Sequence, residues 1–257
     1  MIRRRARHHG HGRRARLPRE QRVQVEERTA AARALVTKGD TRVLARVDAA
    51  PPGYLLAHSA ATIVRHCEML EPVPAEGEAR VVVTPRVTPG SWYLDVAASD
   101  RPGLLAAFTG VLHREAIEVT QAVLATWDDG AALQSFVVRA KHAVDAATLE
   151  AGFADALDAV VRVVAVPGVQ VAFDDSASPL YTACQVTAPD EPGLLHAIAS
   201  AVAAAGVDIH AARVTTVDGV AHDHFDLSDR HGAKLDANLQ ALIVGGLRGL
   251  EVCSHPT

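Results

Sequence analysis

The chain has 257 residues, of which 49% are hydrophobic and 4% aromatic, and its formal net charge is −4. The length allows one large or two small domains with a packed core, the charge argues against nucleic-acid binding by the body of the protein, and no apolar run reaches membrane-spanning length. Three widely spaced cysteines, Cys67, Cys184 and Cys253, argue against a disulfide framework and favour a reducing, cytoplasmic location.

Residues 1–22 form a basic block with nine arginines. No apolar segment follows it directly, so it lacks the pattern of a secretory signal peptide. Like-charge blocks of this kind are usually disordered. We therefore expect a disordered, solvated tail over 1–22, and contact with nucleic acid or an acidic partner is the alternative.

The segment 23–78 is expected to hold short helices and a Pro-containing linker. Gly39-Asp40 and Pro51-Pro52-Gly53 are interpreted as helix breaks. Apolar spacing and composition predict helices over 21–36, 41–47 and 58–70. So few residues do not make a strong core alone, so we expect them to dock on the next domain or to belong to something larger.

A short turn occurs twice. Asp100-Arg101-Pro102-Gly103-Leu104-Leu105 recurs 90 positions later as Asp190-Glu191-Pro192-Gly193-Leu194-Leu195. Each copy follows a strand-like run and precedes an Ala-rich helical run, so one supersecondary unit is repeated. The two aspartates are placed where a carboxylate can cap a helix, and the two prolines suit a first helical turn.

The glycines of the two turns allow a close backbone approach or an unusual dihedral angle. Free amides at a helix N-terminus can bind an anion such as a carboxylate. The alternative is that each turn is only a good strand-to-helix connection. The repetition predicts a shared fold and leaves the ligand open.

Periodicity predicts the element order β-α-β-β-α-β, the ferredoxin-like split unit, in both copies. In the first unit, 79–174, strands are expected over 80–86, 91–97, 117–127, 131–139 and 169–173, and helices over 102–114 and 145–161. In the second unit, 179–255, strands are expected over 180–187, 207–217, 220–227 and 250–253, and helices over 192–205 and 234–247. The predicted fold class is α+β, with two such domains in tandem.

The sequence resembles an ACT domain in four features. These are the repeated turn, the Ala-rich helix, the run from Ala205 to Thr216 and the Asp218-Gly219 hairpin. Over roughly residues 55–250, the tandem pair resembles the C-terminal regulatory part of the bifunctional uridylyltransferase/uridylyl-removing enzymes that modify the PII protein. The resemblance implies a regulatory module that binds an amino acid, with glutamine as the specific candidate, in nitrogen or amino-acid metabolism. It also implies ACT–ACT pairing, within the chain or in a homo-oligomer.

The resemblance places a ligand between paired units, near the first turn and the strand that follows. Carried over by position, the ligand-binding residues are Asp190, Pro192, Gly193, Leu194, Asp208, Ile209, Asp100, Arg101, Gly103 and Leu104. The turn amides would receive a carboxylate, and a turn aspartate would pair with an ammonium group. Arg101 stands where the second copy has Glu191, so the copies are expected to bind different ligands, or only one copy binds.

The family's catalytic parts are not matched in this chain. Gly90-Ser91 is followed by no Asp-x-Asp pair, and the His222-Asp223 pair lies in a predicted strand. Alternate positions put His222, His224 and Asp226 on one strand face, a set that can bind zinc, but an acidic-x-Phe hairpin pattern accounts for this stretch as well. We expect no catalytic residue, metal or cofactor.

The favoured function is a regulatory protein without its own catalytic domain. The PII protein or a separate catalytic subunit are the protein partners that the resemblance implies, and no membrane or nucleic-acid partner is expected. The alternatives are a diverged or truncated uridylyltransferase-type enzyme and a structural oligomerisation module.

Overall fold

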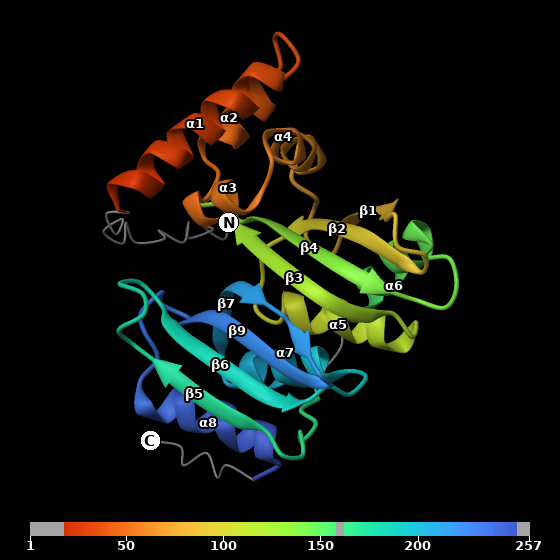
Figure 1. The fold of residues 1–257 in the computed structure, drawn as a ribbon, viewed down its shortest axis with the longest axis vertical. Helices are drawn as coiled ribbons and strands as arrows, with labels where there is room; N and C mark the ends of the chain where they lie inside the picture. The colour runs from red at the N-terminus through yellow and green to blue at the C-terminus, as the bar shows by residue number, and fades with distance from the viewer. Residues whose placement is uncertain (1–17, 158–161, 251–257) are drawn as a thin grey trace, which may run out of the picture.

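The computed structural model describes residues 18–157 and 162–250 (Figure 1). Within these residues, a segment of four helices precedes two antiparallel sheets, each with two helices. The basic tail predicted over 1–22 lies mostly outside the described residues, and its described end is already helical from Arg19. No helix in the described part is long and apolar enough to span a bilayer.

The helical segment comprises α1 to α4. These helices span Arg19–Leu35, Thr41–Asp48, Pro52–Ala57 and Ala60–Met69. Asp40 caps α2 by accepting a hydrogen bond from the Val43 amide, and Ser59 caps α4 through the Thr62 amide. The predicted break at Pro51-Pro52 is instead the start of α3, because proline is well tolerated at the first helical position, where no amide donor is needed.

The first unit is a four-stranded sheet with strand order β1-β2-β4-β3. Its strands are β1 (Ala79–Pro85), β2 (Ser91–Ser99), β3 (Glu118–Thr126) and β4 (Ala131–Arg139), and its helices are α5 (Leu104–Arg114) and α6 (Ala146–Leu157). The helices pack together through Phe108 and Phe153, whose ring centroids lie 4.4 Å apart. Together with the apolar face of the sheet, they form one part of the hydrophobic core.

The second unit repeats this arrangement with strand order β5-β6-β9-β7, and the short strand β8 pairs with β9. Its strands are β5 (Gln170–Asp174), β6 (Thr182–Pro189), β7 (Val207–Arg213), β8 (Thr216–Val217) and β9 (Val220–Asp229), and its helices are α7 (Leu194–Ala204) and α8 (Ala237–Arg248). Cys184 is 2% exposed in β6, as expected of a small core residue. The predicted ferredoxin-like α+β fold is thus present in both units.

The edge strand of each sheet comes from a different part of the chain than predicted. The strand predicted to close the first unit is β5, and it pairs with β6 of the second sheet, with Val171 opposite Val186. The equivalent edge beside β2 is already occupied by β1. In each sheet, the edge strand beside β2 or β6 therefore precedes that strand in the sequence and does not follow the second helix of the unit. The predicted last strand over 250–253 lies almost wholly outside the described residues.

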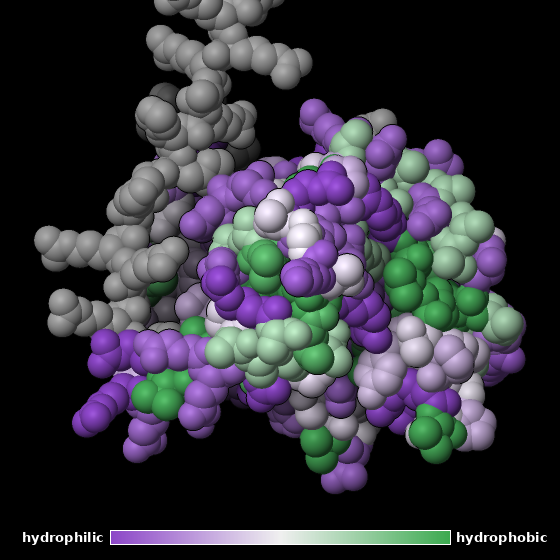
Figure 2. Space-filling model, turned by 90° about the horizontal axis from the view of Figure 1, so that it is seen from above, coloured by the Kyte–Doolittle hydropathy of each residue, from purple (hydrophilic) through white to green (hydrophobic). Residues whose placement is uncertain are grey.

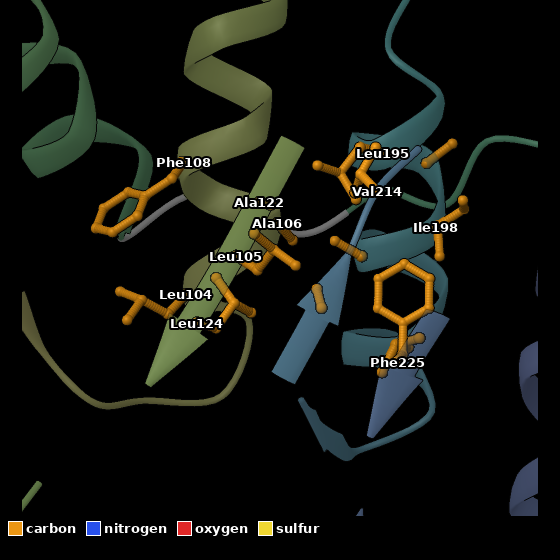
Figure 3. Packing of buried hydrophobic residues seen from close by; sticks show 14 of the residues in the cluster. Leu104, Leu105, Ala106, Phe108, Ala122, Leu124, Leu195, Ile198, Val214 and Phe225 are labelled. Atoms are coloured by element: carbon orange, nitrogen blue, oxygen red, sulfur yellow. The ribbon is translucent and has the colours of Figure 1, made fainter. Parts of the chain in front are cut away.

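The two units lie side by side, with α5 against α7 and β3 beside β7 (Figure 1). Their apolar residues form one continuous core. Figure 3 shows the apolar side chains on either side of the junction: Leu104, Leu105, Phe108 and Leu124 in the first unit, and Leu195, Ile198 and Phe225 in the second. His196 on α7 also bonds across it, since its Nδ1 lies 2.9 Å from the Ala106 carbonyl oxygen on α5. The expected pairing within the chain therefore forms through helices and edge strands together.

The helical segment docks on the opposite face of the first sheet. A second apolar cluster joins Val47, Ile63 and Cys67 of the helices to Trp127 and Leu133 of the sheet. Figure 2 looks down on this end of the molecule, where hydrophilic and hydrophobic side chains are interspersed. The helices therefore obtain their core by docking, as expected of a segment too small to form one alone.

Candidate ligand-binding site

The two glycine turns have the same geometry. The Leu104 amide donates to the Arg101 carbonyl at 3.2 Å, and the Leu194 amide donates to the Glu191 carbonyl at 3.0 Å. Gly103 has φ 80° and ψ 7°, and Gly193 has φ 87° and ψ 3°. A proline followed by a residue with these angles is the signature of a type II β-turn. Glycine is favoured there because a side chain would be strained at positive φ.

This geometry changes the roles expected for the aspartates and prolines. Gly103 and Gly193 are the N-cap residues and make no side-chain cap, so each proline precedes its helix. The Asp190 carboxylate accepts a hydrogen bond from the Thr216 hydroxyl at 2.9 Å. The predicted capping role of Asp190 is therefore wrong, because the type II turn separates it from the helix start.

Each turn is instead tied to a hairpin through the aspartate backbone. The Asp100 amide donates to the Gly130 carbonyl at 2.7 Å, and the Asp190 amide donates to the Gly219 carbonyl at 2.9 Å. The first hairpin connects β3 and β4, and the second connects β8 and β9. A backbone hydrogen bond thus joins the start of each turn to the hairpin of the same unit.

Two predicted residues of the first turn share a pocket of about 270 Å³. Its lining residues are Glu76, Gly77, Glu78, Ser99, Asp100, Arg101 and Leu157. The carboxylates can bind an ammonium group, and the Arg101 guanidinium can bind a carboxylate in bidentate fashion. The pocket therefore gathers residues of both charge signs, and all of its lining residues precede the second unit in the chain.

The turn of the second unit faces a side chain of the first. A Cβ atom added to Gly193 would lie 2.8 Å from Cε1 and 2.9 Å from Nδ1 of His113. His113 and Arg114 end α5, so two basic residues are close to the start of α7. His113 was not among the predicted site residues, and its contact with the second unit has no local signature in the sequence.

Asp208 and Ile209 are not brought together with the Asp190 turn. They lie at the start of β7, opposite Ser228 and Leu227 of β9. The 11-residue helix α7 separates them from the turn by about 16 Å, at 1.5 Å per residue. The end of α5 contacts the start of α7, so the two helices are antiparallel. The start of β7, which follows the end of α7, therefore lies on the side of the first unit's glycine turn (Figure 1).

A buried carboxyl group lies near the second turn. Asp223 is 1% exposed, and its Oδ1 accepts the Thr215 amide at 3.4 Å. Burial raises the pKa of Asp223 to about 7; the Thr215 amide opposes this rise and the Asp190 charge adds to it. The equivalent residue of the first unit is Gln134, because Asp223 lies opposite Val186 as Gln134 lies opposite Val96.

The side chains around Asp223 alternate between the two faces of β9. Asp223 and Phe225 are buried, whereas His222, His224 and Asp226 are at least partly exposed. The three metal-compatible residues therefore share the open face of the sheet. Within the described ranges, no group of three or more His, Cys, Asp or Glu residues is arranged to hold a metal ion.

Residues 182–242 match the ACT domain family. The second unit is an ACT domain. The first unit has the same strand order, helices and type II turn, so the fold consists of two ACT-like units in tandem. The family match runs from the start of β6 into α8 and includes the predicted residues of the second unit: Asp190, Pro192, Gly193, Leu194, Asp208 and Ile209.

The ACT-containing chain resembles part of several bifunctional uridylyltransferase/uridylyl-removing enzymes. The protein from Gluconobacter oxydans is 30% identical over 217 residues, which cover 74% of this chain and 22% of that protein. Those from Vibrio campbellii and Rhodospirillum rubrum are 27% and 28% identical and cover 73% and 72% of this chain, but 23% and 22% of the relatives. The chain thus spans less than a quarter of the length of the curated relatives it matches.

Among solved structures, aspartate kinase from Synechocystis is 17% identical with a TM-score of 0.37. The alignment covers 60% of this chain and 26% of the kinase chain.

Proposed function

We propose that this chain is a cytoplasmic regulatory protein whose tandem ACT units bind an amino acid, with glutamine as the specific candidate. It acts in nitrogen or amino-acid metabolism. The repeated type II turn at a helix start is the observation that carries this proposal. The ACT match over 182–242 and the relatives named above support it.

The proposed sites are shared between the units. The first combines one unit's turn with the start of the other unit's edge strand: Asp100, Arg101, Gly103, Leu104, Asp208 and Ile209. The second combines the Asp190, Pro192, Gly193 and Leu194 turn with His113. The antiparallel packing of α5 and α7 supports this grouping, because it places His113, near the end of α5, beside Gly193 at the start of α7.

The chemistry of the first turn suits a zwitterion. The Leu104 amide already donates to the Arg101 carbonyl, but the helix amides that follow it have no intrahelical acceptor and attract a carboxylate. Arg101 adds a cation, while Asp100 and Glu78 offer carboxylates to an ammonium group. A ligand that fits one arrangement of the paired units better than another shifts their equilibrium toward it.

Calorimetric titration with each of the twenty amino acids tests the proposal. We expect saturable binding of one of them, weakened about tenfold or more in Asp100→Asn, because charged hydrogen bonds contribute about 1.5–3 kcal/mol. Asp48→Asn, on the exposed surface of α2, is the matched control and should bind like the wild type. No heat with any amino acid in a folded sample would contradict the proposal.

The relatives' names motivate a second candidate, uridylyl transfer to or removal from PII. Incubation with PII, UTP and Mg²⁺ tests it, and we expect no transfer. Label on PII would favour the enzyme. A complex of PII with this chain, without label transfer, would favour PII as a regulatory partner.

A further inference from the structure

The hairpin between β3 and β4, residues 127–130, contacts the helical segment through a buried cation. Nη1 of Arg46 on α2 lies 2.7 Å from Asp129 Oδ1, and its Nε lies 2.7 Å from Glu71 Oε1. The Arg46 side chain is only 6% exposed. The Trp127 indole Nε1 also donates to the Arg46 carbonyl at 3.1 Å. The hairpin is therefore held by both the side chain and the backbone of one residue of α2.

The same hairpin holds the glycine turn of the first unit. Gly130 accepts the Asp100 amide at 2.7 Å, and the Asp129 carboxylate accepts the Ala131 amide at 3.2 Å. Asp129 thus orders the hairpin internally while it binds Arg46. A short chain of hydrogen bonds runs from α2 through the hairpin to the start of the turn.

The second unit has the same link from turn to hairpin but a different hairpin environment. Gly219 accepts the Asp190 amide at 2.9 Å, yet both Asp218 and Gly219 are exposed, as is Val217 at 53%. The helical segment packs on the first sheet, away from this hairpin. The repeat therefore contains a matched internal comparison. Asp128 and Asp129 are exposed as well, but the first hairpin is bonded to α2, whereas the second has no such bond among the described residues.

We infer that the hairpin 127–130 couples the first glycine turn to the helical segment, so that these helices respond to the state of the first turn and not of the second. This goes beyond ligand binding, because it assigns the two units different roles whichever ligand they take. Coupling of this kind is reciprocal, so a change at either end alters the other. The physical element is the hairpin itself, whose two ends are bonded to different parts of the molecule.

Amide hydrogen exchange on the full chain tests the coupling without a ligand. Asp129→Asn keeps an acceptor for the Ala131 amide but removes the charge facing Arg46, and Trp127→Phe removes the indole donor while keeping a ring. We expect the Asp100 amide to exchange faster in each variant: about tenfold in Asp129→Asn, which weakens a charged hydrogen bond, and about two- to tenfold in Trp127→Phe, which removes a neutral one. The Asp190 amide should exchange as in the wild type.

The matched control breaks an ion pair in the same helices away from the hairpin. Asp48→Asn removes the exposed Arg33–Asp48 bridge, whose atoms lie 2.7 Å apart, and should leave both amides unchanged. In the reverse direction, Gly103→Ala strains the first turn and should speed exchange of the Trp127 indole proton.

Equal acceleration at Asp100 and Asp190 would overturn the inference, because it would report a general loss of stability. Unchanged Asp100 exchange in both hairpin variants would overturn it too. These outcomes are separate from the amino-acid titration: coupling can be present in a chain that binds no amino acid, and binding can occur without coupling.

Discussion

Two buried aspartates show how local partners determine charge at the scale of a residue. Asp95 is 3% exposed. Burial would raise its pKa, but the close contacts of its carboxylate with His66 Nε2 at 3.1 Å and Arg65 Nη2 at 3.0 Å hold the pKa below its ordinary value. Asp223 is equally buried with one long amide contact, and its pKa rises to about 7. A buried carboxylate with close polar partners and a guanidinium nearby keeps a low pKa, whereas burial raises the pKa of one that lacks them.

Asp223 should make the free energy of unfolding fall as pH rises. Its folded pKa of about 7 exceeds the unfolded value of about 3.9, so the native state binds more protons between these values. The stabilising contribution is complete below about pH 4 and is lost as pH rises through about 7. Urea denaturation from pH 5 to pH 8 should show a loss of up to a few kcal/mol, at about 1.4 kcal/mol per pKa unit.

Asp223→Asn should remove that part of the pH dependence, because the amide keeps an acceptor for Thr215 and carries no charge. Asp218→Asn, in the exposed neighbouring hairpin, serves as the control and should retain the wild-type slope. Identical pH slopes for wild type and Asp223→Asn would show that the buried carboxyl does not titrate in this range.

At the scale of an element, the contact between α5 and α7 depends on small residues. A Cβ atom at Gly110 would lie 2.8 Å from Cε1 and 3.1 Å from Nδ1 of His196. The His196 ring cannot move away freely, because its Nδ1 bonds the Ala106 carbonyl oxygen at 2.9 Å. The absence of a side chain at Gly110 therefore lets the His196 ring of the second unit pack against α5.

Gly110→Ala should destabilise the protein by about 1–3 kcal/mol through overpacking, although alanine is intrinsically about 1 kcal/mol better in a helix. Thermal or urea denaturation measures the change. The double variant Gly110→Ala/His196→Ala should be less destabilised than the sum of the two single variants, because the clash is absent. A Gly110→Ala protein more stable than the wild type would show that the helices separate at no cost.

At the scale of the whole molecule, the two sheets differ in what covers them. The first sheet has helices on one face and the helical segment on the other, so Leu133 is 1% exposed. His222 occupies the corresponding register position of the second sheet, opposite Thr187 as Leu133 is opposite Ala97. No helix among the described residues docks on the sheet face that carries His222. The covered position therefore has an apolar leucine, and the uncovered position has a polar histidine.

Replacing these matched residues should have unequal effects. Leu133→Ala removes buried apolar contacts between the sheet and the helical segment and should cost about 2–5 kcal/mol of unfolding free energy. His222→Ala should change it by less than about 0.5 kcal/mol, as expected for a surface position. Urea denaturation of both variants under the same conditions measures the two changes in unfolding free energy. Equal losses would mean that the face of the second sheet around His222 is covered as well.

Much of the fold followed from local patterns. Strand alternation, helical spacing and the repeated Pro-Gly turn predicted both ferredoxin-like units, and the type II geometry at Gly103 and Gly193 needs only neighbouring residues. The candidate site was predicted less completely. The turn residues stay a prediction, Asp208 lies in β7, away from the Asp190 turn, and neither His113 nor Asp223 is among the predicted ligand residues.

The sequence by itself determined the repeated strand-turn-helix unit and its resemblance to ACT domains, because backbone angles and side-chain periodicity are local properties. Tertiary structure alone decided that β5 joins the second sheet, that His113 faces Gly193, and that Arg46 holds the first hairpin but not the second. These contacts join residues far apart in the chain, and they depend on which sheet edge is unoccupied and which faces pack together.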